Sequence, residues 1–455
     1  MKVTPTIRAE LEQFLQQEGL TLSQFGQIAG MNRGMVSAIV TGNKSMSVNQ
    51  LDLITEAMSL PEGYFYDLFI ENFIIDHPPN MRRIEPFLYR CAELDKLDAI
   101  RRVVGAIMDN LLYSPKLFDI AEELLSQERL EAALILYEGV AETERYQHSE
   151  RLAICQYRLF TIRVGDDQEK SYDAAVQFEP YIERLDEIDQ LDALRALVNI
   201  YRSLRKWTKM DTFATALGNK AEIQYRIDLQ RTKSEQTKKP FYPPFVYWAF
   251  SHLIRAEVCD ANKDYETALQ HIQKYADLSW VEEKDETTQK WKNQFKEWAN
   301  ANTYVNRLLA GEINVLLDYV NFISLRKDEL LPALDIIVEA ANRYHFDVDD
   351  ILKQFEVEIS SYLEKQKIES FYTQRFVTER YMHFSKELAV YYLTKGRFSD
   401  GFNFLLSCLA KSTLINNKSY IIKCVKLYES YKEYASSETK VLYEKLIKEV
   451  EEDEA

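Results

Sequence analysis

The chain has 455 residues and a mass of 53.4 kDa, more than one hydrophobic core usually serves, so two or three domains or an extended array of repeats are expected. Only 13 Gly and 11 Pro residues are present, which is too few for the turns of a many-stranded sheet and predicts a mostly helical protein. A formal net charge of −16 argues against broad nonspecific adhesion to nucleic acid or anionic membranes, so any contact with DNA must be local.

Residues 1–75 differ from the rest of the chain in their glycine content. Six of the 13 glycines fall within the first 63 residues, and short helices joined by tight turns need glycine at their ends. Thr21 and Gln24 predict a capping box, Gly30 a left-handed turn, and Asn32 the cap of a second helix that Gly42 ends. The apolar positions of the two helices are spaced to face one small core: Phe25, Ala29, Met31, Val36 and Ile39.

This pattern resembles the helix-turn-helix of the Cro and phage-repressor superfamily over about residues 6–70. The family's small residue in the first helix, turn glycine, buried Val-Ser-x-Ile and terminal glycine are met by Gly26, Gly30, Val36, Ser37, Ile39 and Gly42. The resemblance implies a five-helix domain whose second motif helix enters the major groove of duplex DNA. It implies contacts to bases from that helix and to phosphate just beyond it, at Asn32, Arg33, Gly34, Met35, Ser37, Ala38, Asn43, Lys44 and Ser45.

The charge of this head limits what one copy can do. It carries four basic residues against eight acids, and Arg33 is the one residue of the reading helix able to contact guanine with two hydrogen bonds. A single head would bind weakly, so a homodimer held together by the rest of the chain and reading two half-sites is predicted. A degenerate helix-turn-helix that contacts only protein is the alternative.

The stretch 76–84 contains Pro78 and Pro79 and is predicted to be a linker. Residues 85–450 then carry a repeated pattern: a small residue, an apolar residue three positions on, and a second small residue twelve positions after the first. Three segments show it, at Ala121/Leu124/Ala133, Ala256/Cys259/Ala268 and Ala389/Tyr392/Gly401. The pattern matches the tetratricopeptide helix-turn-helix and predicts a right-handed helical solenoid, with large residues such as Leu130 filling between the helices. A loop is expected at 238–244, and 451–455 is a short acidic tail.

One segment of the repeat region suggests a peptide-binding surface. Trp291, Phe295, Trp298 and Asn302 recur on one face of a predicted helix. An amide can donate and accept hydrogen bonds, so asparagines on a concave helical surface can hold a peptide backbone while aromatic residues form pockets. The candidate peptide-binding residues are Asn199, Tyr201, Trp298, Asn302, Tyr304, Asn306, Asn321 and Phe322. The alternative is that the aromatic residues are repeat core and the asparagines are solvated.

No motif for catalysis is found. The six histidines form no HExxH pattern, and no nucleophile elbow, P-loop or dinucleotide fingerprint is present, so no enzyme activity, cofactor or metal is expected. The five cysteines are odd in number and far apart with no CxxC pair, which indicates buried thiols in a reducing cytoplasm. No run of apolar residues is long enough to cross a membrane, and no membrane partner is expected.

A Cro-like head followed by a long acidic repeat region looks like the peptide-pheromone receptor regulators of Gram-positive bacteria, the Rap/Rgg/NprR/PlcR/PrgX group. The resemblance implies a cytoplasmic homodimer whose repeats bind a short oligopeptide, as in quorum sensing or a phage lysis–lysogeny decision, and thereby alter operator binding. The alternative is a regulator whose repeats capture or inhibit a signalling partner, with the head not used on DNA.

Overall fold

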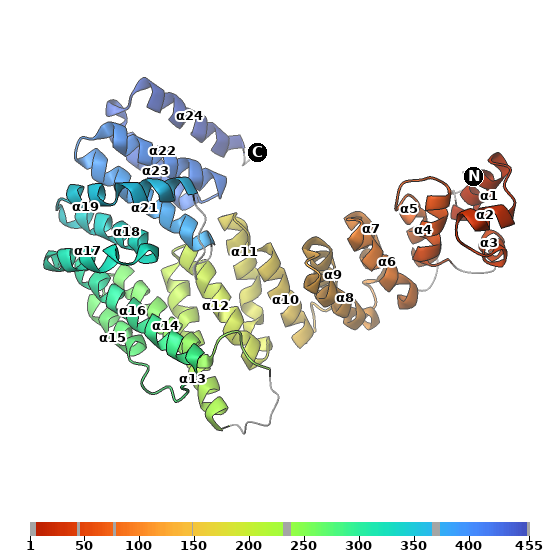
Figure 1. Cartoon of the computed structure of the whole chain (residues 1–455), viewed down its shortest axis with the longest axis horizontal. Helices are drawn as coiled ribbons and strands as arrows, with labels where there is room; N and C mark the ends of the chain where they lie inside the picture. Colours follow the sequence, from red (N-terminus) through yellow and green to blue (C-terminus); the bar gives the residue numbers. More distant parts are fainter. Residues whose placement is uncertain are drawn as a thin grey trace. The chain divides into compact units, whose positions relative to one another are not determined.

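The computed structural model describes residues 6–42, 46–75, 79–147, 149–230, 238–365 and 374–452. These residues are helical and form no strand, which confirms the predicted all-α class (Figure 1). By packing, the chain divides into two units, residues 1–162 and 163–455.

The first unit opens with the five helices predicted for the head and continues with longer ones. The head contains α1 (Ile7–Gln17), α2 (Leu22–Ile28), α3 (Arg33–Val40), α4 (Val48–Ala57) and α5 (Tyr66–Ile70). After it come α6 (Met81–Glu93), α7 (Leu97–Ile107), α8 (Ser114–Ser126), α9 (Leu130–Thr143) and α10 (Glu150–Arg163).

Local sequence explains how α2 and α3 begin and end. The Thr21–Gln24 capping box forms in both directions, with distances of 3.3 and 2.9 Å, and the Asn32 side chain caps α3 by accepting from Met35 N–H at 2.8 Å. Gly30 has φ +62°, the left-handed turn that was predicted. The five predicted core residues are all buried.

Gly26 permits the close crossing of α2 and the turn that leads into α3. A Cβ at this position would lie 2.6 Å from the carbonyl oxygen of Met31, a backbone atom that cannot move aside. The predicted need for a small residue is therefore confirmed as a packing requirement.

The head packs directly onto the next two helices. The ring of Phe87 in α6 lies 4.9 Å from that of Tyr66 and 5.0 Å from that of Phe69. Arg90 of α6 pairs with Asp52 at 2.9 Å. Of the predicted linker 76–84, residues 76–78 are outside the described residues, and residues 81–84 belong to α6, which begins at Met81. An independent domain of residues 1–75 stays a prediction.

The three segments with the repeated pattern adopt the same turn between paired helices. The middle residue of each pattern accepts, through its carbonyl, from the backbone N–H five positions on: Leu124 from Arg129 (2.9 Å), Cys259 from Asp264 (2.8 Å) and Tyr392 from Arg397 (2.9 Å). This bond is typical of a Schellman turn, which needs one residue in the left-handed region. The predicted turn between two helices is therefore confirmed at these three places, and the assignment of the segments to tetratricopeptide repeats stays a prediction.

Glycine fills that left-handed position in only one of the three turns. Glu128 (φ 60°) and Lys263 (φ 64°) occupy it in the first two, and Gly396 (φ 74°) in the third. This is how long helix pairs form with so little glycine. One predicted filler is wrong: Leu130, the first residue of α9, is 45% exposed.

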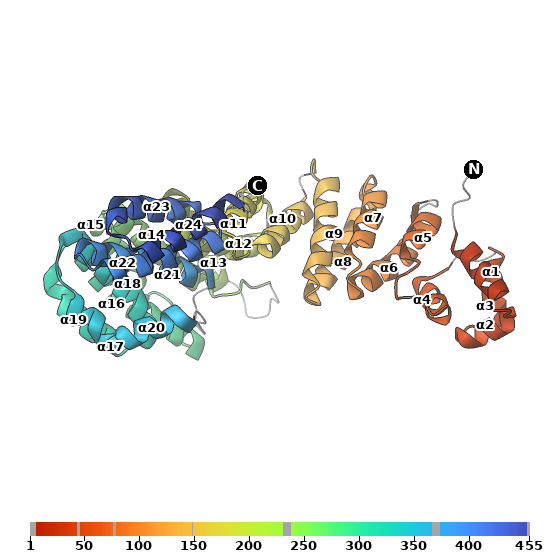
Figure 2. The same ribbon diagram turned by 90° about the horizontal axis from the view of Figure 1, so that it is seen from above.

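The second unit holds the remaining helices (Figure 2). Successive helices pack on one another from α11 to α18 and from α21 to α23, and α18 packs on α21. They are α11 (Gln168–Phe178), α12 (Glu187–Ser203), α13 (Trp207–Gln230), α14 (Pro244–Ala261), α15 (Tyr265–Ala276), α16 (Glu286–Leu309), α17 (Leu316–Ser324), α18 (Lys327–Tyr344), α19 (Asp349–Gln354), α20 (Glu356–Lys365), α21 (Gln374–Thr394), α22 (Phe398–Leu414), α23 (Lys418–Tyr431) and α24 (Ser437–Glu452). The loop predicted at 238–244 is confirmed, since α14 begins at Pro244.

Residues near the end of the second unit contact residues at its start. The backbone N–H of Gln168, at the start of α11, donates to the carbonyl of Ile415 at 3.0 Å, and Asn417 donates to the Gln168 side chain at 2.5 Å. Helices α12 and α21 also pack together. The helices of this unit therefore curl around a shared interior.

Candidate functional site

The first turn of α3 is the exposed part of the predicted DNA-reading helix. Asn32, Arg33 and Gly34 are exposed, whereas Met35, Ser37 and Ala38 are partly exposed. Arg33 makes no hydrogen bond or ion pair within the described residues, so its guanidinium is available to a ligand. The remaining predicted contacts, Asn43, Lys44 and Ser45, lie outside the described residues.

Half of the acids of the head are paired on the side that packs against α6 and α7. Arg90 binds Asp52 at 2.9 Å and Glu62 at 3.0 Å, and Arg102 of α7 binds Asp67 and Glu71. These two arginines lie beyond residue 75, so they do not enter the charge count of the head. The acidic balance of residues 1–75 is therefore partly neutralised by the helices that follow.

A second candidate site is a cavity of about 290 Å³ within the second unit. Its walls come from α12, α13, α14, α16, α17, α18 and α21 and from the turn before α13. Aromatic and aliphatic side chains such as Trp207, Phe250, Trp298 and Tyr319 form one part of the lining. This volume lies close to the lower end of the range for small-ligand pockets.

Four arginines and four carboxylates also line the cavity. Arg202 donates to Glu257 at 2.7 Å, Arg343 donates to Glu339 at 2.7 Å, and Arg205 pairs with Glu379. The fourth arginine, Arg380, binds Asp335 behind the wall at 3.3 Å. Each arginine of the lining is thus paired with a carboxylate.

Asp260 is the exception among the carboxylates. It is 8% exposed and makes no ion pair within the described residues, and its Oδ1 accepts from the Asn306 amide at 2.8 Å. Burial is the largest cause of its raised pKa, about 7; the Asn306 hydrogen bond lowers this pKa, and the nearby Glu257 and Glu339 raise it.

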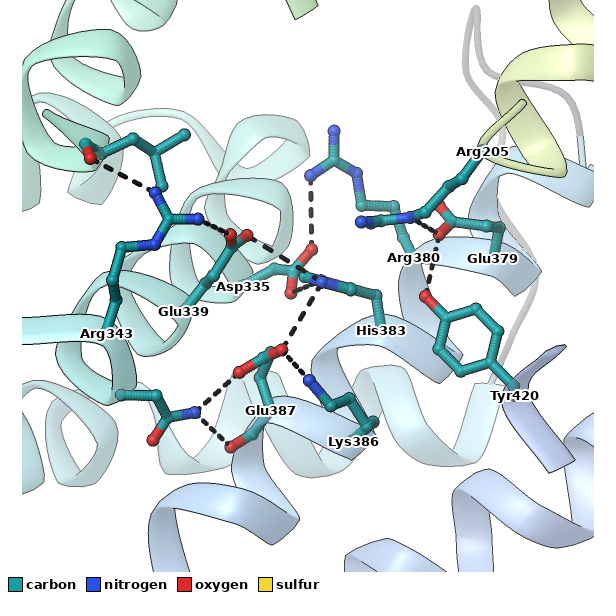
Figure 3. Close-up of polar contacts among 12 residues, drawn as sticks. Arg205, Asp335, Glu339, Arg343, Glu379, Arg380, His383, Lys386, Glu387 and Tyr420 are labelled. Atoms are coloured by element: carbon teal, nitrogen blue, oxygen red, sulfur yellow. Dashed lines mark hydrogen bonds and ion pairs between the residues drawn. The ribbon is translucent and has the colours of Figure 1, made fainter. Parts of the chain in front are cut away.

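A buried network of charges supports the wall formed by α18 and α21 (Figure 3). Nδ1 of His383 lies 2.6 Å from Asp335, and Nε2 of His383 lies 3.7 Å from Glu387. Burial by itself raises the pKa of Asp335, but His383 and Arg380 lower it below its ordinary value.

Beside these residues, Arg205, Glu379 and Tyr420 form a cluster of polar contacts between distant parts of the chain. Glu379 of α21 pairs with Arg205 from the turn before α13, and the Tyr420 hydroxyl of α23 donates to Glu379 at 3.2 Å (Figure 3). These bonds connect the turn between α12 and α13 to α21 and α23 beside the cavity. The network is therefore part of what gives the cavity its shape.

The structure does not bring the eight predicted peptide-binding residues onto one surface. Trp298 and Asn302 line the cavity, and the Asn302 amide donates to the Tyr275 hydroxyl at 2.8 Å. Asn321 is exposed on α17, while Asn199 is half-buried on α12 and lies outside the cavity lining.

The other four predicted residues are engaged within the fold. Tyr201 is fully buried and binds Glu179, and the Asn306 amide donates to both Asp260 and the Tyr265 carbonyl. Tyr304 stacks on Tyr319 with ring centroids 5.5 Å apart, and the guanidinium of Arg326 covers the Phe322 ring at 3.8 Å. The eight residues therefore do not form one surface. Peptide contact by Trp298 and Asn302 stays a prediction.

Sequence reasoning missed the charged lining because its members are far apart in the chain. Arg205 and Glu379 are 174 positions apart, and Asp335 and His383 are 48 apart. One sequence feature could have indicated this lining. Glu257 and Asp260 are charged residues that lie close in sequence to Ala256, a small residue of the repeated pattern, and all three line the cavity.

No protein-family model matches the chain. No curated protein matches it. A solved structure to which the chain is similar is that of Bacillus thuringiensis PlcR in complex with the peptide PapR7 and DNA; the match covers 78% of this chain and 99% of that chain, at 13% sequence identity and a TM-score of 0.23. A similarity this distant supports no argument about family or function. None of the described helices is both long and apolar enough to cross a membrane.

Proposed function

We propose that the protein is a DNA-binding transcriptional regulator and that a short oligopeptide bound in the cavity of its second unit alters its affinity for an operator. The observation that carries the proposal is the exposed first turn of α3, where Arg33 has no partner within the described residues. The helix-turn-helix assignment of the head, the tetratricopeptide assignment of the repeats, a cytoplasmic location and the absence of enzyme activity belong to this proposal.

The proposal of DNA binding rests on the geometry of α2 and α3. Asn32 caps α3 and Gly26 holds the two helices close, so the first turn of α3 projects as an exposed helix end. Gly34 in that turn has open space around its Cα, apart from the Asn32 side chain, and this allows close approach of a base edge or phosphate. With few cations on the head, useful affinity requires two half-sites, so a homodimer is part of the proposal.

The proposal of peptide binding rests on the cavity of the second unit. The lining combines apolar side chains, among them Trp298 and Phe250, with charged side chains, and this combination suits a ligand with both side chains and a polar backbone. A peptide that contacts several helices of this unit would favour one arrangement of them. Its effect on DNA affinity then equals its differential affinity for the DNA-bound and free forms.

Arg33→Ala is expected to weaken binding to selected DNA by about 1–3 kcal/mol, with relaxed preference at one base pair of each half-site. The full-length protein is first used to select duplexes from a random library, and affinities for the enriched duplex are then measured by fluorescence anisotropy. Enriched sites with two inverted half-sites are expected from a dimer.

Arg101→Ala is the matched control, because Arg101 is an exposed arginine of the same unit that pairs with Asp98 on its own helix. This variant should bind the enriched duplex like the wild type. Equal affinity and equal base preference for Arg33→Ala and Arg101→Ala would contradict DNA reading by α3.

A second candidate function, the capture of a signalling protein by the repeats, is favoured by one feature. Ile313, Leu317 and Leu325, on and beside α17, are 41%, 70% and 84% exposed. If no duplex is enriched at any salt concentration while the protein is folded, this second function becomes the better account.

A further inference from the structure

The cavity contains one buried carboxylate that lacks a cation. Of the four carboxylates in the lining, Glu257, Glu339 and Glu379 each contact an arginine, whereas Asp260 contacts an amide. Only Oδ1 of Asp260 has a hydrogen-bond partner within the described residues. Asp260 therefore keeps a free acceptor oxygen in the lining of the cavity.

The groups around Asp260 do not supply the missing positive charge. Asn306 from α16 is neutral and uses its amide hydrogens on Asp260 and on the carbonyl of Tyr265 from α15. Glu257 on α14 and Glu339 on α18 are acidic and act on Asp260 repulsively. The nearby arginines are engaged: Arg202 by Glu257, and Arg343 by Glu339 and the Tyr265 hydroxyl.

An uncompensated buried carboxylate is costly, and the cost is removed when an ionised partner forms a hydrogen bond to it. An ammonium or guanidinium group entering the cavity would meet a free carboxylate oxygen and a locally negative potential. A neutral or acidic group would leave Asp260 unpaired or add a repulsive charge. The arrangement thus discriminates between ligands by charge.

We propose that the cavity recognises a basic residue of its peptide ligand and that Asp260 is the group that receives the ammonium or guanidinium. This proposal rests on the proposed peptide-binding function and specifies the ligand class. The apolar wall around Trp298 and Phe250 would then accept the hydrophobic stem of the same residue or an apolar neighbour.

The test uses the full chain and pools of capped hexapeptides in which one position is fixed as Lys, Arg, Leu or Glu and the others are random. At about pH 8, the Lys and Arg pools should be retained about tenfold or more above the Leu pool in equilibrium dialysis, the gain expected from one charge-assisted hydrogen bond. Asp260→Asn should remove this preference without reducing retention of the Leu pool. Glu266→Gln, an exposed carboxylate on α15, is the matched control and should keep the preference.

Three outcomes would overturn the proposal. Equal retention of the Lys, Arg and Leu pools by the wild type would refute charge recognition while leaving peptide binding intact. A basic preference that survives in Asp260→Asn would assign it to another group. No retention of any pool would contradict both this proposal and the proposed peptide-binding function. Unfolding profiles of the two variants, measured in parallel, show that each is folded.

Discussion

Glu379→Ala is expected to lower the free energy of unfolding of the second unit by about 3–5 kcal/mol, because removing one partner of a buried ion pair leaves the other charge uncompensated. Glu379 is 2% exposed; its carboxylate binds Arg205 and accepts from the Tyr420 hydroxyl at 3.2 Å. All five tryptophans of the chain lie between residues 207 and 298, so tryptophan fluorescence during urea denaturation reports on this unit alone.

Two variants separate the ion pair from a general effect of removing a glutamate. Glu358→Ala removes an exposed carboxylate of α20 and should change stability little. Glu379→Gln keeps hydrogen-bonding atoms but not the charge, so its loss should be smaller than that of Glu379→Ala. Similar midpoints of urea denaturation for Glu379→Ala and Glu358→Ala would show that the contacts of Glu379 with Arg205 and Tyr420 contribute nothing to stability.

Asp260→Asn is expected to stabilise the second unit at neutral and higher pH. The pKa of Asp260 rises from its ordinary 3.8 to about 7 in the folded protein, so the fold binds a proton that the unfolded chain releases. Asp260 therefore costs no stability below about pH 4, an increasing amount between pH 4 and 7, and its full cost above pH 7. At about 1.4 kcal/mol for each tenfold change in acidity, the full cost approaches about 4 kcal/mol.

The measurement is urea denaturation of Asp260→Asn and wild type from about pH 4 to pH 8, again by tryptophan fluorescence. Asparagine can still accept from Asn306, so the amide contact is retained. The gain in stability should grow with pH and level off above pH 7. Glu266→Gln should show no such trend, since Glu266 is exposed. A pH-independent difference for Asp260→Asn would mean that Asp260 has an ordinary pKa.

The parts of the fold that the sequence predicts are those that depend on residues close together in the chain. Thr21 with Gln24, Asn32 and Gly30 act within one turn of the backbone, so their roles follow from spacing alone. The register of the repeats was predictable for the same reason, since Leu124 and its counterparts sit in local turns. Exposure of Leu130 was not predictable, because it depends on which helix covers that position.

The cavity required the tertiary structure. Trp298 and Asn302 were placed correctly on one helix face, but the helix pattern does not distinguish a face that lines a cavity from one that packs in the core. Asn306 lies one turn further along the same helix and has become part of the packing, with its amide used by Asp260 and Tyr265. The pairing of Arg205 with Glu379 depends on the curl of the whole unit and leaves no trace in local spacing.

If the proposed function holds, ligand binding in the cavity and DNA binding by α3 are linked. The most direct test is the affinity of the full-length protein for its enriched duplex, measured by fluorescence anisotropy with and without a saturating concentration of the best-retained Lys or Arg hexapeptide. We expect the peptide to change this affinity by about 5- to 150-fold, in either direction, and Asp260→Asn to reduce the change. An unchanged affinity for DNA in the presence of a peptide that demonstrably occupies the cavity would contradict it.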